Sequence, residues 1–410
     1  MRPHTLRALI ALLASLMLAA CHTTPPKQHI PPLLVTPTVA APPAVELPAP
    51  TPPFAASSWE KLPGWQSADL LPSFSALQQS CRALKNKANW QTVCSRAEAL
   101  VSTDNIGLHQ FFESAFTPFQ VFNPDGSSQG LITGYYEPKL LGSRTKTKRF
   151  TYPIYGVPDD LLTIDLGDVY PQFKGMRLRG RLQGKRVLPY FDRAEIEQGK
   201  AAVQGRELFW VDNAVELFFL QIQGSGRIEL PDGSHVKIGY ADQNGQPYIS
   251  IGKKLVELGE LKLEQASMQG IKQWGEQHPD KLPALLAQNP SYVFFRELPD
   301  QLSSPLGALG VPLTNAYSIA IDPRTIPLGV PVFLSTTYPN TSEPLNRLML
   351  AQDTGGAIRG AVRADFFWGY GEEAGAQAGR MKQDGQMWVL FPKGGEPLIS
   401  APPNVLSRNP

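Results

Sequence analysis

The spacing of apolar residues changes near Pro118, and this change limits the folds that the chain can adopt. Over residues 66–117 apolar side chains recur at helical spacing, so we predict two or three helices there. Over residues 120–248 the apolar runs are short and are separated by turn sequences such as Pro124-Asp125-Gly126. This pattern indicates an antiparallel β domain, with one helix over residues 193–204.

Helical spacing returns over residues 253–286, and strand-like runs resume over residues 292–391. The predicted fold class is therefore mainly β with helices. The alternation of blocks predicts a β domain carried inside a chain whose first and last parts form another domain. The roughly 350 residues after residue 58 suffice for two domains with sizeable cores.

The N-terminal sequence has the features of an export signal. A short basic region precedes an apolar stretch over residues 8–20, which is too brief to span a bilayer comfortably. We interpret residues 1–20 as a signal peptide. The stretch ends in Leu18-Ala19-Ala20-Cys21, which resembles the bacterial lipoprotein processing box and implies lipidation of Cys21. An ordinary signal peptide with an incidental cysteine is the alternative.

The residue after Cys21 is His22, not the aspartate associated with inner-membrane retention, so the expected location is the periplasmic face of a Gram-negative outer membrane. Residues 22–58 contain eleven prolines and almost no charge, a composition that cannot bury enough apolar surface to fold. We therefore expect residues 21–58 to form a lipid-anchored tether. The folded part is expected to be soluble, and residues 397–410 to be a tail.

Two further cysteines, Cys81 and Cys94, would share an oxidising compartment. On one continuous helix they would lie about 20 Å apart, which is beyond bonding range. A disulfide therefore requires a turn between them, near Asn86 to Asn89. Two buried free thiols remain the alternative.

Several kinds of chemistry have no support in the sequence. The net charge of +2 argues against nucleic acid as a partner. The histidines lack ligand spacing, so no metal is expected. Ser225 follows Gln223-Gly224, which lacks the first glycine of a nucleophile elbow, and no phosphate-binding loop occurs. Carboxylate chemistry remains.

Two aspartates lie in the segment that concentrates candidate functional residues. An apolar run leads to Asp353 before a Thr-Gly-Gly turn, and a second run returns to Asp365, which Phe366, Phe367 and Trp368 follow. Aromatic neighbours reduce the solvation of a carboxyl group and raise its pKa towards the range of a general acid. The alternatives are a turn residue for Asp353 and a solvated strand-end residue for Asp365.

The segment from Ala308 to Lys393 resembles the 3D domain, named for three aspartates that match Asp322, Asp353 and Asp365. Three upstream motifs are similar to the membrane-bound lytic murein transglycosylase A family: Thr133-Gly-Tyr-Tyr-Glu-Pro138, Phe218-Phe-Leu-Gln-Ile-Gln-Gly-Ser-Gly-Arg227 and Asn289-Pro-Ser-Tyr-Val-Phe-Phe295. The resemblance covers about residues 60–395 and implies a double-psi β-barrel with an inserted second β-barrel. The expected domains are an N-terminal helical part (59–133), the inserted barrel (134–248) and a C-terminal part (249–396, with the 3D domain about 308–393).

The resemblance also implies cleavage of the β-1,4 bond between N-acetylmuramic acid and N-acetylglucosamine in peptidoglycan, with 1,6-anhydromuramoyl products. Asp365 would be the catalytic acid and base, and no cofactor is implied. Glycan strands would be the substrate, outer-membrane lipid would hold the anchor, and cell-wall synthesis proteins are candidate partners. The rival functions are a non-catalytic peptidoglycan-binding lipoprotein and a true muramidase that uses Asp353 as a second carboxylate.

The remaining candidate residues have supporting or binding roles. Asp353 is expected to hold Asp365 or its loop in place, and Asp322 reads as a turn residue at a strand end. The candidates for substrate binding, chosen for aromatic faces and directed hydrogen bonds, are Thr133, Tyr135, Tyr136, Gln223, Ser225 and Trp368. For the two tyrosines, core packing is the alternative.

Overall fold

The computed structural model describes residues 53–100, 104–173, 176 and 178–397. The predicted signal peptide, the lipidation site Cys21, and most of the predicted tether and tail lie outside the described residues. Within the described residues, no helix is long and apolar enough to cross a membrane.

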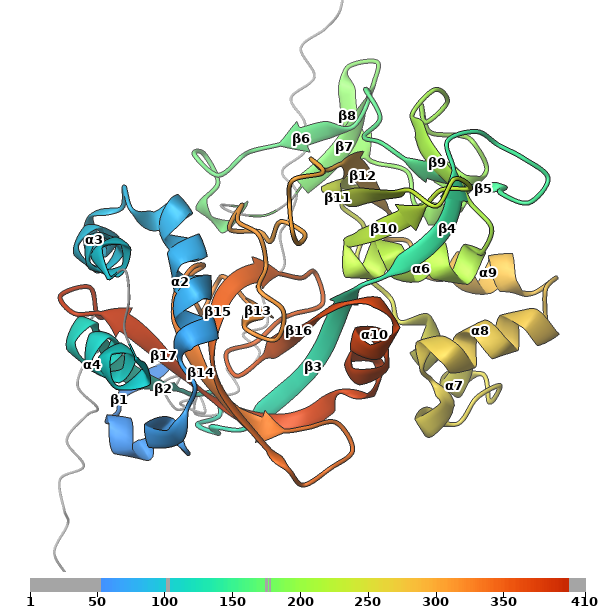
Figure 1. Cartoon of the computed structure of the whole chain (residues 1–410). Coiled ribbons are helices and arrows are strands. Elements are labelled where there is room, and N and C mark those ends of the chain that lie inside the picture. Colours follow the sequence, from blue (N-terminus) through green and yellow to red (C-terminus); the bar gives the residue numbers. More distant parts are fainter. Residues whose placement is uncertain (1–52, 101–103, 174–175, 177, 398–410) are drawn as a thin grey trace, which may run out of the picture. The chain divides into compact units, whose positions relative to one another are not determined.

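The first and last parts of the described chain share one eight-stranded sheet (Figure 1). Its strands, in the order β1-β2-β17-β14-β15-β13-β16-β3, are β1 (Phe54–Ala56), β2 (Phe116–Val121), β17 (Lys382–Pro392), β14 (Pro331–Thr337), β15 (Pro344–Thr354), β13 (Ser318–Ile321), β16 (Ala364–Tyr370) and β3 (Gly130–Glu137). Strand β17 also pairs with β3, so the six strands from β17 to β3 close into a barrel. The fold is mainly β with helices, as predicted.

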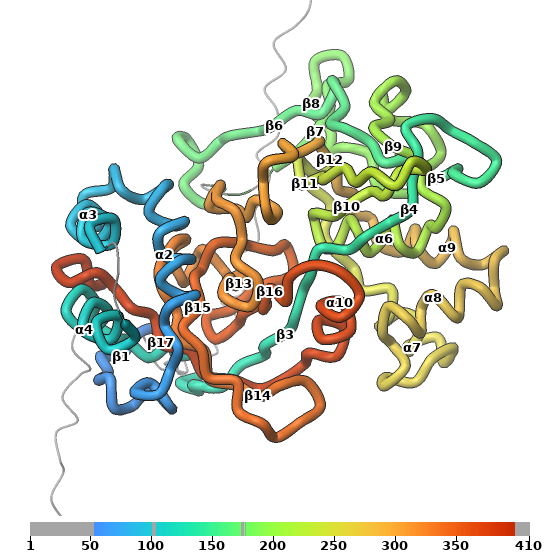
Figure 2. The backbone as a smooth tube through the Cα atoms, in the orientation of Figure 1, coloured from blue at the N-terminus to red at the C-terminus, as the bar shows by residue number. Residues whose placement is uncertain are grey.

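Two parallel pairs, β13 with β15 and β16 with β3, occur in this otherwise antiparallel barrel. Three helices pack against it: α2 (Leu71–Leu84), α3 (Gln91–Ala99) and α4 (Asn105–Ala115). Helix α2 lies beside β15, although the two are far apart in the sequence (Figure 2). Apolar side chains at helical spacing, including Phe74, Leu77 and Leu84, are buried in the shared core, which explains the periodicity seen in the sequence.

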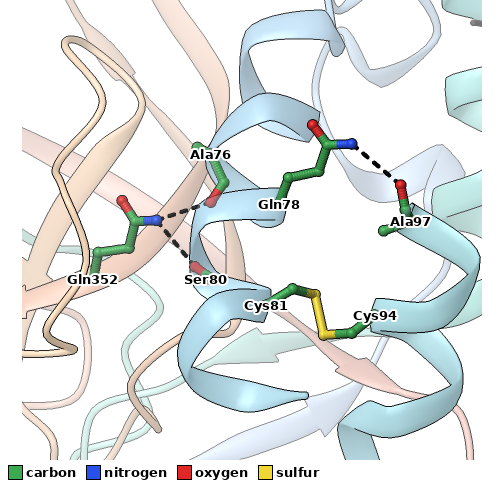
Figure 3. The surroundings of a disulfide bond; sticks show 7 residues. All are labelled: Ala76, Gln78, Ser80, Cys81, Cys94, Ala97 and Gln352. Atoms are coloured by element: carbon green, nitrogen blue, oxygen red, sulfur yellow. Dashed lines mark hydrogen bonds between the residues drawn. A yellow bond between two sulfur atoms is a disulfide. The ribbon is translucent and has the colours of Figure 1, made fainter. Parts of the chain in front are cut away.

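Cys81 and Cys94 form a disulfide that joins α2 to α3 (Figure 3). The chain turns at residues 85–87 and through a short 3₁₀ segment, Ala88–Trp90, and this brings the two Cα atoms to 5.4 Å. Gln78 Nε2 also donates a hydrogen bond to the carbonyl of Ala97 across the same pair of helices, at 3.2 Å. Of the two alternatives, a disulfide and two buried free thiols, the disulfide is correct. The turn also lies where it was predicted, near Asn86 to Asn89.

The chain leaves the barrel after β3 and builds a second sheet before it returns at β13 (Figure 1). This six-stranded sheet has the order β12 (Val293–Glu297), β11 (His235–Gln243), β10 (Ser225–Glu229), β4 (Lys139–Ser143), β9 (Glu207–Val211) and β5 (Tyr152–Tyr155). A small sheet contains β6 (Leu162–Ile164), β7 (Leu178–Gln183) and β8 (Arg186–Pro189). The prediction of an antiparallel domain holds for the other strand pairs of this region, but β10 pairs in parallel with β4 after a long crossover.

The helices of the middle region differ in part from those predicted. The expected interval over residues 253–286 contains α7 (Ile251–Glu257), α8 (Met268–Gln277) and α9 (Leu282–Leu286). The helix predicted over residues 193–204 is shorter, because α5 ends at Glu197 (Arg193–Glu197) and Gly199 adopts a φ of 76°.

Two helices were not predicted, α6 (Ala214–Gln223) and α10 (Gly371–Arg380). The apolar run in α6 fits a buried strand equally well. Helix formation is favoured by its ends: Asn213 Oδ1 accepts hydrogen bonds from the N–H groups of Val215 and Glu216, and Gly224 ends the helix at a φ of 76°.

The expected end of the tether at residue 58 is also wrong. Phe54–Ala56 form β1, which pairs antiparallel with β2. The ring of Phe54 packs edge-on against that of Phe391 at 5.2 Å, which gives this short strand an apolar contact with the core.

Candidate active site

Strand pairing places Thr133 directly beside Asp365. The two residues are partners in the parallel ladder between β3 and β16. Thr133 Oγ1 donates a hydrogen bond of 2.6 Å to Asp365 Oδ1, and Arg363 Nη2 donates one of 2.9 Å to Thr133 Oγ1. A hydroxyl that accepts from a guanidinium has its own hydrogen left to donate, so Arg363 directs the Thr133 hydroxyl towards the carboxyl group.

Asp353 lies near Asp365 because both belong to strands that flank β13. Ala320 of β13 pairs with Asp353 on one side and with Asp365 on the other. Asp353 Oδ2 accepts a hydrogen bond from the hydroxyl of Tyr135 at 3.0 Å, and Oδ1 accepts from the N–H groups of Ala308 and Thr354, each at 2.9 Å. These bonds fix the Asp353 side chain against the barrel and the loop that begins at Ala308.

The pKa of Asp365 is raised to about 6, mainly because burial removes solvent from its carboxyl group. The hydrogen bond from Thr133 and the charge of Arg363 lower this pKa, whereas the charge of Asp353 raises it. Burial and the neighbouring aspartates also raise the pKa of Tyr135 well above its ordinary value, so its hydroxyl remains a hydrogen-bond donor. Asp365 can therefore be protonated near neutral pH, as a general acid must be.

A pocket of about 600 Å³ opens onto this carboxyl group. The barrel and its loops contribute one set of lining residues: Thr133, Leu306, Gly307, Ala308, Gly310, Leu313, Asp353, Thr354, Gly355, Gly356, Ala357, Ile358, Arg363 and Asp365. Helix α6, the six-stranded sheet and its loops contribute the rest: Gln221, Ile222, Gln223, Gly224, Ser225, Tyr240, Ala241, Gln243, Tyr248, Ser291, Val293 and Arg296. The volume and the mixed lining suit an oligosaccharide segment.

The pocket brings together five of the residues singled out in the sequence, Thr133, Gln223, Ser225, Asp353 and Asp365. Gln223 Oε1 accepts a hydrogen bond from the backbone N–H of Tyr136 at 3.0 Å, which connects the end of α6 to β3.

The other four candidates lie elsewhere. Tyr135 is buried behind Asp353, with its ring 5.1 Å from that of Phe367. Tyr136 lines a different pocket, beside Met268 and Tyr370. Asp322 is 2% exposed and binds the Arg324 guanidinium, which lowers the pKa of Asp322 to about 2.

Trp368 does not line the pocket either. Successive side chains of a strand point to opposite faces, so Phe366 and Trp368 face away from Asp365. The Trp368 ring packs 4.6 Å from that of Phe366, and its Nε1 donates to Met381 Sδ at 3.3 Å. Its position beside Asp365 in the sequence therefore gives it no place in the pocket.

The pocket residues that were not predicted from the sequence include Tyr248, Arg296 and Arg363. Arg363 could have been predicted from the sequence, because it lies two residues before Asp365 and alternate residues of an extended chain point to the same side. Tyr248 and Arg296 come from the second sheet region, far from either aspartate in the sequence, and no local pattern marks them.

Comparisons with known proteins agree with this architecture. Residues 131–296 match the family model described as the MltA specific insert domain, and residues 317–391 match the 3D domain. Membrane-bound lytic murein transglycosylase A of Escherichia coli K12 is 35% identical over 294 residues, which cover 70% of this chain and 72% of the relative.

Solved structures give the same result. MltA from Neisseria gonorrhoeae is 42% identical with a TM-score of 0.73, over 85% of this chain and 97% of that one. A membrane-bound lytic murein transglycosylase from Agrobacterium tumefaciens is 33% identical with a TM-score of 0.74, over 83% and 98% of the two chains. E. coli MltA with bound chitohexaose is 29% identical with a TM-score of 0.63, over 83% and 95%.

The fold, the pocket and these matches place the chain among the lytic murein transglycosylases, which are peptidoglycan-degrading lyases. Within that class, it belongs to the membrane-bound lytic murein transglycosylase A family.

Proposed function

We propose that this enzyme cleaves the β-1,4 bond between N-acetylmuramic acid and N-acetylglucosamine and leaves 1,6-anhydromuramoyl ends, with Asp365 as its single acid and base. The observation that carries the proposal is the raised pKa of Asp365, about 6, at the wall of a pocket large enough for sugars. The bound chitohexaose of the E. coli relative supports a glycan strand as the ligand of this pocket.

The reaction needs one proton donor and one proton acceptor in turn. Protonated Asp365 gives its proton to the glycosidic oxygen, and the bond from C1 to that oxygen breaks. The resulting carboxylate takes the proton of the muramoyl C6 hydroxyl, whose oxygen bonds to C1 and closes the anhydro ring. Asp365 ends protonated, and no water is consumed. Because the nucleophile belongs to the substrate, its effective concentration is high.

The contacts of Asp353 favour a supporting role over that of a second catalytic carboxylate. Its two oxygens accept hydrogen bonds from Tyr135, Ala308 and Thr354, which hold it to the barrel wall. A muramidase would need a second carboxylate available as nucleophile or as base for water. We therefore assign to Asp353 the positioning of the pocket loop and an electrostatic contribution to the pKa of Asp365. To Asp322 we assign only the positioning of its own turn, because its carboxylate accepts hydrogen bonds from the Arg324 guanidinium and from the N–H of Gly360.

The finer architecture and the location belong to the same proposal. The two parallel pairs within the closed six-stranded barrel favour a double-psi β-barrel. The six-stranded sheet of the middle region, with the order β12-β11-β10-β4-β9-β5, favours a second inserted barrel. The family name, membrane-bound, favours the lipid anchor at Cys21 and the periplasmic face of the outer membrane. Cell-wall synthesis proteins remain candidate partners.

The products test the proposal. The enzyme is incubated with purified sacculi, and the soluble products are analysed by mass spectrometry. Muropeptides with 1,6-anhydro ends are 18 mass units lighter than their hydrolysed counterparts, because no water is added. Reducing ends would identify a muramidase, and the absence of released sugar would identify a binding protein.

A further inference from the structure

Four charged side chains line the pocket within the described residues: Asp353, Asp365, Arg296 and Arg363. The two aspartates repel an anionic ligand, so a ligand with a carboxylate needs a compensating cation. The two arginines differ in whether they can supply it.

Arg363 is committed to the protein. Its Nη1 donates to the carbonyl oxygens of Leu131 and Ala364, and its Nη2 donates to Thr133 Oγ1. Burial lowers the pKa of Arg363, while the charge of Asp365 raises it. Its guanidinium therefore orients the Thr133 hydroxyl and has little capacity for a ligand.

Arg296 is exposed on β12 and makes no side-chain hydrogen bond or ion pair with the described residues. Its neighbour Glu297 points to the opposite face of the strand, where Arg144 binds both of its oxygens at 2.7 and 3.0 Å. On the neighbouring strand β11, Asp242, whose register partner is Phe294, is bound by Arg179 at 2.9 Å. Glu297 and Asp242 are thus already paired with other arginines, so the Arg296 guanidinium is available to a ligand in the pocket.

We propose that Arg296 is a specificity-determining residue that binds a carboxylate carried by the muramoyl residue of the substrate. The inference rests on the proposed function, since muramoyl residues alone in the glycan bear a lactyl group. That carboxylate is the lactyl group itself in strands without peptides, and an acid of the stem peptide in strands that retain them. A guanidinium suits either, because its planar N–H groups match the two oxygens of a carboxylate.

The experiment measures binding without turnover, in the Asp365→Asn background, by isothermal titration. The probes are glycan strands stripped of peptides by an amidase, the same strands with their carboxylates converted to methylamides, strands that retain their stems, and chitohexaose. Arg296→Gln should weaken binding of a carboxylated strand about tenfold, the loss expected for one solvent-accessible charge-assisted hydrogen bond. Binding of the methylamide strands and of chitohexaose should not change.

Comparison of the stripped strands with the strands that retain their stems distinguishes the two sources of the carboxylate. A loss confined to stripped strands identifies the lactyl group, and a loss on strands with stems identifies the peptide. Arg186→Gln is the matched control, because Arg186 is exposed on β8, carries the same charge and does not line the pocket. It should leave all four affinities unchanged.

An equal loss on neutral and carboxylated strands, or no loss on any, would overturn the proposal. Failure of the proposed function is a separate outcome. It would appear as the absence of anhydromuropeptides from the reaction of the enzyme with Asp365 intact, whereas these affinities are measured without any reaction.

Discussion

Thr133 Oγ1 donates a 2.6 Å hydrogen bond to Asp365 Oδ1 across 232 residues of sequence. The parallel pairing of β3 with β16 sets this contact, and Arg363 orients the hydroxyl from the other side. A hydrogen bond to the charged form of a carboxyl group lowers its pKa. Thr133 therefore opposes the effect of burial on the pKa of Asp365, which lies at about 6.

Thr133→Val should raise the pKa of Asp365 above its present value of about 6, because the hydrogen bond that favours the carboxylate is lost. In the proposed mechanism Asp365 must begin protonated, so kcat/KM is expected to fall as pH rises through this pKa. The alkaline limb of the pH profile should therefore move to higher pH in the variant. Thr133→Ser keeps a hydroxyl and should leave the limb in place. Superimposable profiles for the valine and serine variants would refute this role.

Asp365→Asn should stabilise the folded protein at neutral and alkaline pH. The folded-state pKa of about 6 lies above the unfolded value of 3.8, so between these values the folded state binds more protons. The free energy of unfolding therefore falls as pH rises through that window. Removal of the ionisable group abolishes this loss, which is worth about 3 kcal/mol at pH 8 and close to nothing below about pH 3. Urea denaturation over this pH range measures it, and a pH-independent difference would contradict the assignment.

Removal of the disulfide should lower stability with little effect on the chemistry. Cys81 and Cys94 are 13 residues apart, and a loop of this size corresponds to about 3 kcal/mol of unfolded-state entropy. A double Cys→Ser variant should lose roughly that amount in chemical denaturation, yet keep its kcat at 25 °C because the bond joins α2 to α3, away from the pocket. A large fall in kcat in the still-folded variant would show that the bond also positions the site.

Cys21→Ser should shift the full-length protein from the outer-membrane fraction to an unprocessed or soluble form, because acyl chains on Cys21 would supply the anchor. The purified folded part should remain active. Fractionation of cells followed by immunoblotting measures the shift. An unchanged distribution would reject lipidation as the means of attachment.

Periodicity in the sequence was enough to predict α2 to α4, because their buried residues recur at helical spacing over long segments. Periodicity did not predict α6, because its apolar run fits a helix and a buried strand equally well. Only the Asn213 cap and Gly224 distinguish the helix from the strand. Proximity in sequence to Asp365 was misleading for Trp368, since alternation along β16 directs it to the other face. Arg296 reaches the pocket through tertiary folding alone.

The activity of Asp365→Asn on sacculi measures whether one carboxyl group performs both proton transfers. Asparagine keeps the volume but has no transferable proton, so the rate of anhydromuropeptide release should fall at least 10²–10⁴-fold, with glycan affinity retained. Asp353→Asn, the matched control, should lose only about tenfold, because Asp353 positions its surroundings. Comparable release by Asp365→Asn, or a folded Asp353→Asn protein that loses more activity than Asp365→Asn, would assign the proton transfers to another group.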